Sequence, residues 1–234
     1  MTSATLLFPA ELAPVVPIAG DTRGYPVHRI FCVGRNYADH VKEMGFEVDR
    51  EAPWYFTKPA NAIVHSGATI AYPPETKNYH YEMELVVAIG APAFRVSVAD
   101  APKAVFGYAT GLDMTRRDLQ IASREQSRPW DLGKAFEQSA VIAALTPAAK
   151  FATLGPRRIS LKVGDTIKQD GKLADLIWSV PEIISHLSRF YHLKPGDLIY
   201  TGTPAGVGAV KSGDHITGEI EGLAPVTLTI GATE

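Results

Sequence analysis

Two glutamates separated by one residue are the first candidates for chemistry in this sequence. Glu82 and Glu84 precede a run of apolar residues that ends at Gly90. In a β-strand, residues two apart point to the same side, so the two carboxylates would share a face about 7 Å apart. Like charges at such a place repel unless a cation lies between them. A solvated strand end is the ordinary alternative, because glutamate is usually exposed.

A third carboxylate favours a cation site over a solvated strand end. Asp113 lies in the otherwise uncharged run Val105–Met114, and an aspartate buried there needs a partner. Three carboxylates without a thiolate suit a hard cation, so Glu82, Glu84 and Asp113 predict a site for Mg²⁺ or Mn²⁺. His80 would lie on the same strand face, where an orienting or core histidine fits better than a ligand.

His40 and Glu43 form a second candidate pair, directly after an apolar strand. If Tyr37–Met44 is helical, the two side chains share one face, and the carboxylate can orient the imidazole and raise its basicity. Such a pair can activate water as a general base. An exposed surface pair is the alternative.

Two further segments have charge or backbone groups suited to anions. Lys134 is enclosed by apolar and aromatic neighbours, where it could stabilise developing negative charge or simply extend its ammonium group to solvent. The segment Thr201–Gly208 is rich in glycine but lacks the Lys-Ser/Thr of a phosphate loop. Its amides could hold a carboxylate, or the segment could be a tight turn that needs positive φ angles.

The elements that would position these residues are mostly strands. Proline at four of the first 26 positions predicts an extended lead-in over residues 1–26, followed by a single catalytic domain over 27–234. Helices are expected at Tyr37–Met44, Ala99–Ala104 and Val180–Tyr191, the last with an S-x-x-E capping box at Ser179. Strands without regular βαβ alternation indicate an α+β fold. The expected strands are Arg29–Val33, Trp54–Thr57, Glu82–Ile89, Val105–Met114, Ile159–Val163, Asp197–Thr201 and Val226–Ile230.

Composition narrows the class of protein. The 234 residues are 46% hydrophobic and 21% charged, which excludes disordered and fibrous classes. The net charge of −2 gives no basis for binding nucleic acid or an anionic membrane, and no apolar run is long enough to span one. The single cysteine, Cys32, favours a reducing cytoplasm.

Taken together and in order, these segments resemble the fumarylacetoacetate hydrolase family. The resemblance extends from about Arg29 to Gly222 and is closest to its short acylpyruvate hydrolase branch. It implies an α+β fold of mixed β-sheets with few short helices, usually in a homodimer. The matching segments are Gly34-Arg35-Asn36-Tyr37 with His40 and Glu43; Trp54-Tyr55-Phe56-Thr57-Lys58-Pro59; Asn78 with His80, Glu82 and Glu84; Gly107-Tyr108 with Asp113, Thr115, Arg117, Asp118 and Gln120; Trp130 with Lys134 and Phe136; and Gly196-Asp197 leading to Thr201–Gly208.

The resemblance also implies roles for individual residues. It implies Mg²⁺ or Mn²⁺ on Glu82, Glu84 and Asp113, and it gives the other positions roles in catalysis or substrate contact. Val163-Gly164-Asp165 departs from the Val-Asn-Gly of many relatives, which affects a hairpin turn that Gly164 can still make. The implied catalytic residues are His40 and Glu43, which would activate water, and Lys134, which would stabilise charge; Gln120 and Thr203 would contact substrate.

The implied reaction is hydrolysis of the C–C bond of a 2,4-dioxo acid, with fumarylpyruvate giving fumarate and pyruvate in the breakdown of aromatic compounds through gentisate. Water would attack C4, and the enolate of pyruvate would leave. We expect Arg35, Arg124 or Arg128 to bind the distal carboxylate. The alternatives are a decarboxylase or isomerase of 2-oxo diacids, such as oxaloacetate, or a metal-dependent protein that binds 2-oxo acids without turnover.

Overall fold

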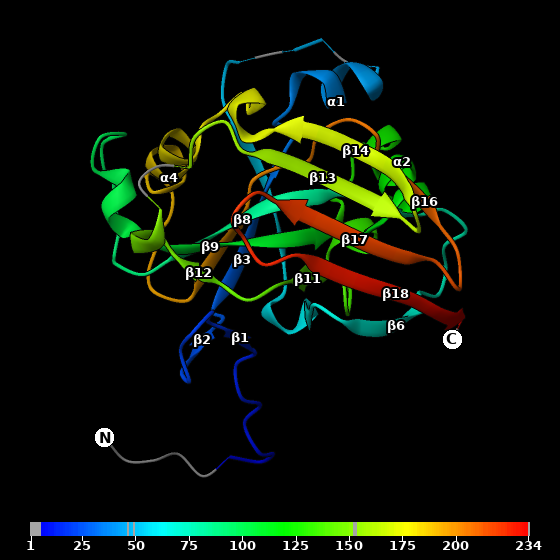
Figure 1. The fold of residues 1–234 in the computed structure, drawn as a ribbon, viewed down its shortest axis with the longest axis horizontal. Helices are drawn as coiled ribbons and strands as arrows, with labels where there is room; N and C mark the ends of the chain where they lie inside the picture. Colours follow the sequence, from blue (N-terminus) through cyan, green and yellow to red (C-terminus); the bar gives the residue numbers. More distant parts are fainter. Residues whose placement is uncertain (1–5, 46, 49, 152–153, 234) are drawn as a thin grey trace.

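The computed structural model describes residues 6–233 except 46, 49, 152 and 153. In this part of the chain, strands of mixed direction form four sheets, and helices are few and short (Figure 1). The structure therefore confirms the α+β class with mixed sheets.

The largest sheet has eight strands. Within it, β15 runs parallel to β3 and β11 runs parallel to β5, and the other pairs are antiparallel. In spatial order the strands are β4 (Trp54–Lys58), β3 (Arg29–Gly34), β15 (Asp197–Tyr200), β8 (Met83–Ile89), β9 (Val105–Asp113), β11 (Ala140–Ile142) and β5 (Ile63–His65), with β12 (Thr146–Pro147) beside β9.

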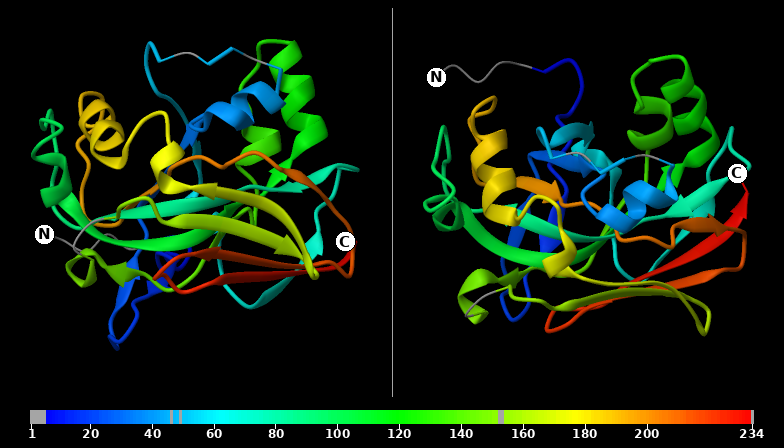
Figure 2. Two further views of the ribbon diagram at one scale, coloured as in Figure 1. Left: turned by 45° about the horizontal axis from the view of Figure 1, so that its top comes forward. Right: turned by 90° about the horizontal axis from the view of Figure 1, so that it is seen from above.

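Three smaller sheets complete the strand architecture. The five-stranded sheet lies across one face of the large sheet, and the helices gather toward one side of the molecule (Figure 2). The five-stranded sheet contains β14 (Thr166–Lys172), β13 (Arg158–Val163), β17 (His215–Ile220), β18 (Val226–Thr233) and β6 (Ala68–Tyr72); the three-stranded sheet contains β10 (Thr115–Arg116), β7 (Tyr79–Tyr81) and β16 (Gly208–Val210); the two-stranded sheet contains β1 (Val15–Pro17) and β2 (Gly24–Pro26).

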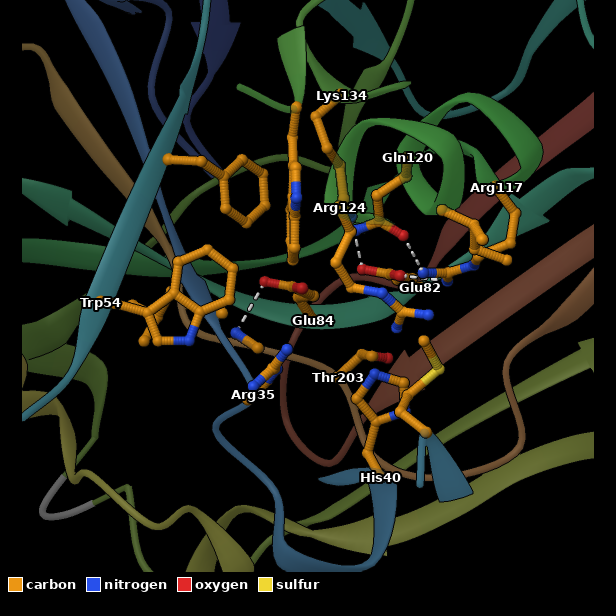
Figure 3. A pocket seen from close by; sticks show the side chains of 17 residues that line it. Arg35, His40, Trp54, Glu82, Glu84, Arg117, Gln120, Arg124, Lys134 and Thr203 are labelled. Carbon is orange, nitrogen blue, oxygen red and sulfur yellow. Dashed lines mark hydrogen bonds and ion pairs between the residues drawn. The ribbon is translucent and has the colours of Figure 1, made fainter. Parts of the chain in front are cut away.

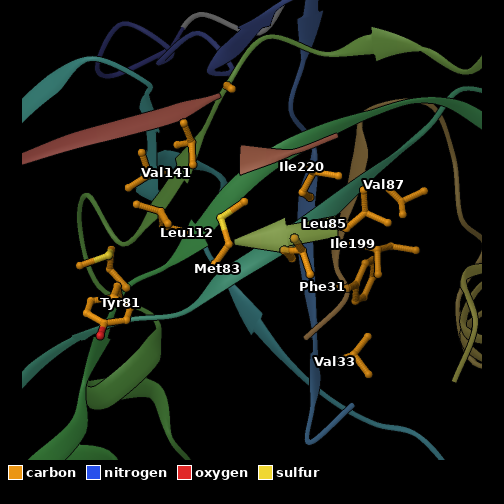
Figure 4. Close-up of a cluster of buried hydrophobic side chains, with 14 of the residues drawn as sticks. Phe31, Val33, Tyr81, Met83, Leu85, Val87, Leu112, Val141, Ile199 and Ile220 are labelled. Atoms are coloured by element: carbon orange, nitrogen blue, oxygen red, sulfur yellow. The ribbon is translucent and has the colours of Figure 1, made fainter. Parts of the chain in front are cut away.

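Strand β8 is buried on both faces, as its sequence predicts. Met83, Leu85 and Val87 pack into a core that also contains side chains of the five-stranded sheet and of a helix (Figure 4). Val86 and Ala88 pack into a second core on the opposite face. Glu84 lies on the same face as Val86, because side chains alternate along a strand. The seven strands expected from the sequence are present, with ends that differ by a few residues.

The start of the folded unit differs from the expected boundary at residue 27. Strands β1 and β2 pair as a short antiparallel hairpin. Val16 and Tyr25 are buried in the second core, and the Tyr25 hydroxyl donates to the carbonyl of Ile89 at 2.7 Å. The two strands are extended, as expected for this segment, but they close one face of the large sheet rather than leading into it.

The helices depart further from expectation. Tyr37–Met44 contains α1 (Ala38–Glu43), and Ala99–Ala104 contains a single 3-10 turn, η2 (Ala101–Ala104). The expected helix Val180–Tyr191 begins at its capping box, but it ends at Leu187, so Phe190 and Tyr191 lie outside it and are exposed rather than buried. The helices and 3-10 turns are α1, α2 (Arg117–Glu125), α3 (Asp131–Lys134), α4 (Val180–Leu187), η1 (Ala60–Ala62), η2, η3 (Ala148–Lys150) and η4 (Leu173–Asp175).

Helices α2 and α3 were not predicted. Arg117–Glu125 starts without a side-chain cap and directly follows a strand, and Asp131–Lys134 is one turn long, so neither has the usual signals of a helix start. None of the described helices is long and apolar enough to cross a membrane.

Candidate active site

The three predicted metal ligands meet at one end of the large sheet. Strands β8 and β9 are antiparallel, and the amide of Asp113 donates to the carbonyl of Glu82 at 2.9 Å. This pairing brings carboxylate oxygens of Glu82, Glu84 and Asp113 within 4.8 Å of one another, and all three residues are buried. The sequence prediction that these carboxylates lie together is confirmed by the geometry.

Three buried cations surround two of these carboxylates. The Lys134 ammonium lies 2.7 Å from an oxygen of Glu82 and 2.7 Å from Asp113 Oδ2. Arg117 donates to the other oxygen of Glu82, and Lys58 Nζ lies 2.9 Å from Asp113 Oδ1. Burial alone would raise the pKa of Glu82, but Lys134 and Arg117 outweigh it and hold that pKa well below its ordinary value.

Of the three carboxylates, Glu84 has the least compensation of its negative charge by nearby cations. Its Oε2 accepts a hydrogen bond from the Gly202 amide at 2.7 Å. Burial, and then the neighbouring carboxylates of Asp113 and Glu82, raise its pKa well above the ordinary value. A buried acidic side chain of this kind is stabilised in its charged form by a cation.

The donor set fits a hard divalent cation. Asp113 Oδ1 is buried and accepts no hydrogen bond, although Lys58 lies close to it. Together with Glu84, it provides oxygen donors without competing thiolate or imidazole, which is the chemistry that Mg²⁺ and Mn²⁺ prefer.

His40 and Glu43 form the predicted pair at the edge of the same pocket. His40 Nδ1 lies 3.1 Å from Glu43 Oε2, and the His40 side chain is nearly buried. The Gly206 amide donates to both oxygens of Glu43, at 3.0 and 3.2 Å. The carboxylate is thus fixed from two sides and can orient the imidazole.

The glycine-rich segment Thr201–Gly208 reaches both groups. Gly202 and Gly206 have φ angles of +99° and +96°, which other residues rarely adopt, and their amides point at Glu84 and Glu43. Both predictions for this segment hold, because it is a turn with positive φ angles and its amides hold carboxylates. Those carboxylates belong to the protein itself.

Several side chains line the rest of the pocket, which is partly open to solvent. Gln120 and Arg124 lie beside Glu82, and Arg35 lies near Trp54, with its Cζ 5.8 Å from the centre of the Trp54 ring (Figure 3). Burial and the nearby charge of Arg124 lower the pKa of Arg35. Two guanidinium groups this close favour an anion between or beside them.

The structure shows which of the candidate arginines line the pocket and where His80 lies. Arg128 is exposed and does not line the pocket, whereas Arg35 and Arg124 do. His80 stands behind Arg117, whose Nε lies 3.4 Å from His80 Nδ1, and its Nε2 lies 2.8 Å from Asn78 Oδ1. Burial and Arg117 lower the pKa of His80 to about 4, so it is a neutral supporting residue and not part of the carboxylate cluster.

Sequence reasoning gave no role to Lys58 or Arg117. Lys58 ends the strand β4, is fully buried and also donates to the carbonyls of Met114 and Lys134. Arg117 donates to both Glu82 and the amide oxygen of Gln120. The signal for Lys58 was a lysine at the end of an otherwise uncharged strand, which needs a partner when it is buried.

With this geometry in place, the chain can be compared with known proteins. The family model described as Fumarylacetoacetate (FAA) hydrolase C-terminal matches residues 29–231. The chain belongs to the fumarylacetoacetate hydrolase family. The match covers all of the candidate site residues, so the predicted resemblance is confirmed.

Individual members of the family are similar over most of the chain. A fumarylpyruvate hydrolase of Ralstonia sp is 53% identical over 193 residues, which is 82% of this chain and 100% of that protein. A mitochondrial oxaloacetate tautomerase of Homo sapiens is 42% identical over 205 residues, 88% of this chain and 92% of that one. The crystal structure of fumarylpyruvate hydrolase from Pseudomonas aeruginosa in complex with Mn²⁺ and pyruvate superposes with a TM-score of 0.94 at 48% identity, covering 97% of this chain and 100% of that one.

Proposed function

We propose that the protein is a metal-dependent hydrolase that cleaves the C–C bond of a 2,4-dioxo acid, with fumarylpyruvate as substrate and fumarate and pyruvate as products. One observation carries the proposal: His40, which is paired with Glu43, lines the same pocket as Glu82 and Glu84 of the carboxylate cluster. The 53% identity to a fumarylpyruvate hydrolase, and the likeness to a structure that holds Mn²⁺ and pyruvate, support it.

We assign Glu82, Glu84 and Asp113 to hold Mg²⁺ or Mn²⁺. The cation, when bound, supplies Lewis acidity that polarises the carboxylate and 2-oxo oxygens of the substrate. The protein's own groups then determine which bond breaks.

Charge balance in the pocket favours a dianionic substrate. The three carboxylates are matched by the three buried cations Lys58, Lys134 and Arg117. A divalent cation adds two positive charges, and Arg35 and Arg124 line the same pocket, so the metal-loaded site has an excess of positive charge that favours a substrate with two carboxylates. Fumarylpyruvate has two, and we assign its distal carboxylate to Arg35 and Arg124.

The proton transfers follow from the pair of His40 and Glu43. His40 takes a proton from water while Glu43 holds its ring, and the hydroxide formed attacks the C4 carbonyl. The C3–C4 bond then breaks, and C3 leaves as the enolate of pyruvate. Lys134 stabilises this negative charge, and protonated His40 returns the proton to the product.

Gln120 and Thr203 are assigned to substrate contact. Arg117 can only donate, so it fixes the oxygen of the Gln120 amide and leaves the NH₂ group for an acceptor on the substrate. Thr203 lines the pocket beside His40 (Figure 3).

A second candidate is tautomerisation of oxaloacetate, because relatives with that name match 86 to 88% of the chain at 42 to 43% identity. Tautomerisation moves a proton at C3 and needs no addition of water. The same pocket offers a base and a dianion site, so the reactions must be separated by assay.

The test uses protein stripped with EDTA and resupplied with Mg²⁺ or Mn²⁺. We expect metal-dependent loss of the enol absorbance of fumarylpyruvate, with fumarate and pyruvate as products. Acetylpyruvate and oxaloacetate are measured in parallel. Conversion of oxaloacetate without cleavage of fumarylpyruvate would replace hydrolysis with tautomerisation or decarboxylation, and metal binding without any turnover would remove the roles of His40 and Glu43.

Three wider assignments rest on the family resemblance and the sequence. We propose a homodimer, which sedimentation velocity tests, and a cytoplasmic location, which the lone buried Cys32 favours. We also propose that the substrate arises from the breakdown of aromatic compounds through gentisate, and growth of a deletion strain on gentisate tests this.

A further inference from the structure

Gln169 is a buried amide in a strand that is otherwise turned to solvent. Along β14 it alone is buried, and its exposed fraction is 0%. The pairing with β13 jumps at this point: Leu161 pairs with Gln169 and Lys162 pairs with Ile167, which leaves Lys168 as an extra residue. Such a bulge redirects a neighbouring side chain, and here it accompanies an inward-pointing amide.

The orientation of this amide is fixed by two backbone groups. Gln169 Oε1 accepts from the Met83 amide at 3.0 Å, and Nε2 donates to the Pro204 carbonyl at 2.7 Å. A backbone N–H can only donate and a carbonyl can only accept, so oxygen and nitrogen cannot be exchanged. Met83 lies between Glu82 and Glu84, so Gln169 connects the strand of the metal ligands to the glycine-rich segment.

The same NH₂ group donates to Thr203 Oγ1 at 2.8 Å. The Thr203 oxygen is therefore an acceptor in this bond, and its own proton must be directed elsewhere. Within the described residues that proton has no other acceptor, and Thr203 lines the pocket beside Glu84 and His40. The hydroxyl is thereby left as a donor to whatever occupies the pocket.

The bulge also fixes the segment that carries Thr203. A Cβ added to Gly206 would lie 2.0 Å from the carbonyl oxygen of Lys168, so the segment is packed directly against β14. The Gly206 amide donates to Glu43 from the same position.

We infer that Gln169 is a positioning residue, which holds the Thr203 hydroxyl as a hydrogen-bond donor to an anionic oxygen of the bound ligand. This inference rests on the proposed function, because it takes a 2-oxo acid as the ligand. Gln169 itself does not touch the ligand; it acts through Thr203.

The experiment measures binding as well as turnover. The probe is oxalate, a planar dianion that resembles the enolate of pyruvate, titrated calorimetrically into protein saturated with Mg²⁺. The variants are Q169E, T203V, T203S and the double variant Q169E/T203V. T166E adds the same charge at an exposed position of β14 and is the matched control.

We expect T203V to bind oxalate about 10- to 100-fold more weakly, because a hydrogen bond to a charged group is lost. In Q169E, one carboxylate oxygen still accepts from the Met83 amide, but the other cannot donate when ionised, so Thr203 turns its proton toward it. The loss of oxalate affinity in Q169E should match that in T203V. The double variant should bind oxalate no more than about 3-fold more weakly than T203V does. T203S and T166E should bind as wild type does.

The pH profile separates this role from a structural one. Burial raises the pKa of the carboxyl that Q169E introduces, and the protonated form can still donate to Thr203. The loss of oxalate affinity should therefore grow as the pH is raised from about 6 to about 9, whereas a merely loosened fold would give the same loss throughout.

The inference is overturned if Q169E binds oxalate as wild type does across this range, if the losses of Q169E and T203V multiply, or if wild type does not bind oxalate. Should Q169E not fold, T203V and T203S decide: equal affinity of T203V and wild type overturns it. Coupled losses of oxalate binding in a protein that does not cleave fumarylpyruvate would support the inference and refute the hydrolase assignment.

Discussion

Replacing Glu84 with glutamine should stabilise the metal-free protein. Glutamine keeps the oxygen that accepts from the Gly202 amide and removes a buried charge that lacks a cationic partner among the described residues. Its NH₂ group also gains a possible acceptor in Asp113 Oδ1, which accepts no hydrogen bond although it forms an ion pair with Lys58. Replacement of buried ionised groups by neutral ones ranges from neutral to stabilising by about 1–4 kcal/mol. At about 2 kcal/mol, a chain of 234 residues would melt about 4–8 °C higher.

The order of stability of the wild type and E84Q should reverse when the cation is present. A metal at about 1,000 times its Kd adds about 4.1 kcal/mol to the wild type. E84Q lacks one charged ligand and should gain little at the same concentration, so the wild type should then be more stable by about 2 kcal/mol. The assay is thermal unfolding with EDTA and with excess Mn²⁺, and E219Q, which changes an exposed glutamate, is the control.

The stability advantage of metal-free E84Q over the wild type should also depend on pH, and it should be smaller at low pH. The pKa of Glu84 is raised in the folded state, so the folded protein binds that proton more tightly than the unfolded chain does. Burying the charged Glu84 lowers the free energy of unfolding of the wild type. This loss of stability is present above the raised pKa and disappears as the pH falls to the ordinary pKa range of a glutamate. The advantage of E84Q should shrink accordingly. A metal-free E84Q that melts below the wild type near neutral pH would refute the reasoning.

Three further perturbations test other parts of the site. H40N should lower kcat by about 10²- to 10⁴-fold while Mn²⁺ affinity, measured by electron paramagnetic resonance, stays the same; unchanged kcat would exclude His40 as the base. R35A should lower kcat/KM for fumarylpyruvate by about 10- to 100-fold and leave acetylpyruvate turnover unchanged, and equal losses for both substrates would show that Arg35 does not read the distal carboxylate. K58M should cost about 3–5 kcal/mol in urea unfolding, because Asp113 loses a buried partner, and a change below about 1 kcal/mol would contradict this.

The sequence predicted strands and carboxylates well because their patterns are local. Alternation along Met83–Ile89 identifies both faces of β8, and the cost of burying Asp113 in an uncharged strand indicates a nearby cation. The His40–Glu43 pair followed from helical spacing. Each of these inferences needs a few neighbouring residues and one physical rule.

The unpredicted features depend on segments far apart in the chain. Lys58 meets Asp113 through the order of strands in the sheet, which no single segment encodes. Gln169 becomes significant through a bulge and a contact with Thr203 34 positions away. The apolar spacing predicts a helix α4 that is too long, because Phe190 and Tyr191 continue the spacing but lie beyond the last helical residue and are exposed.

The glycine-rich segment has a consequence for how this pocket can change in evolution. One short stretch of backbone holds the proposed metal ligand Glu84 and Glu43, the partner of the proposed base, and it carries Thr203, which we assign to substrate contact, so a substitution there disturbs all three together. Arg35 and Arg124, which line the same pocket, come from other segments, so either can be exchanged without changing the sequence of that stretch. Selection can therefore alter which acid is accepted while the reaction centre stays intact.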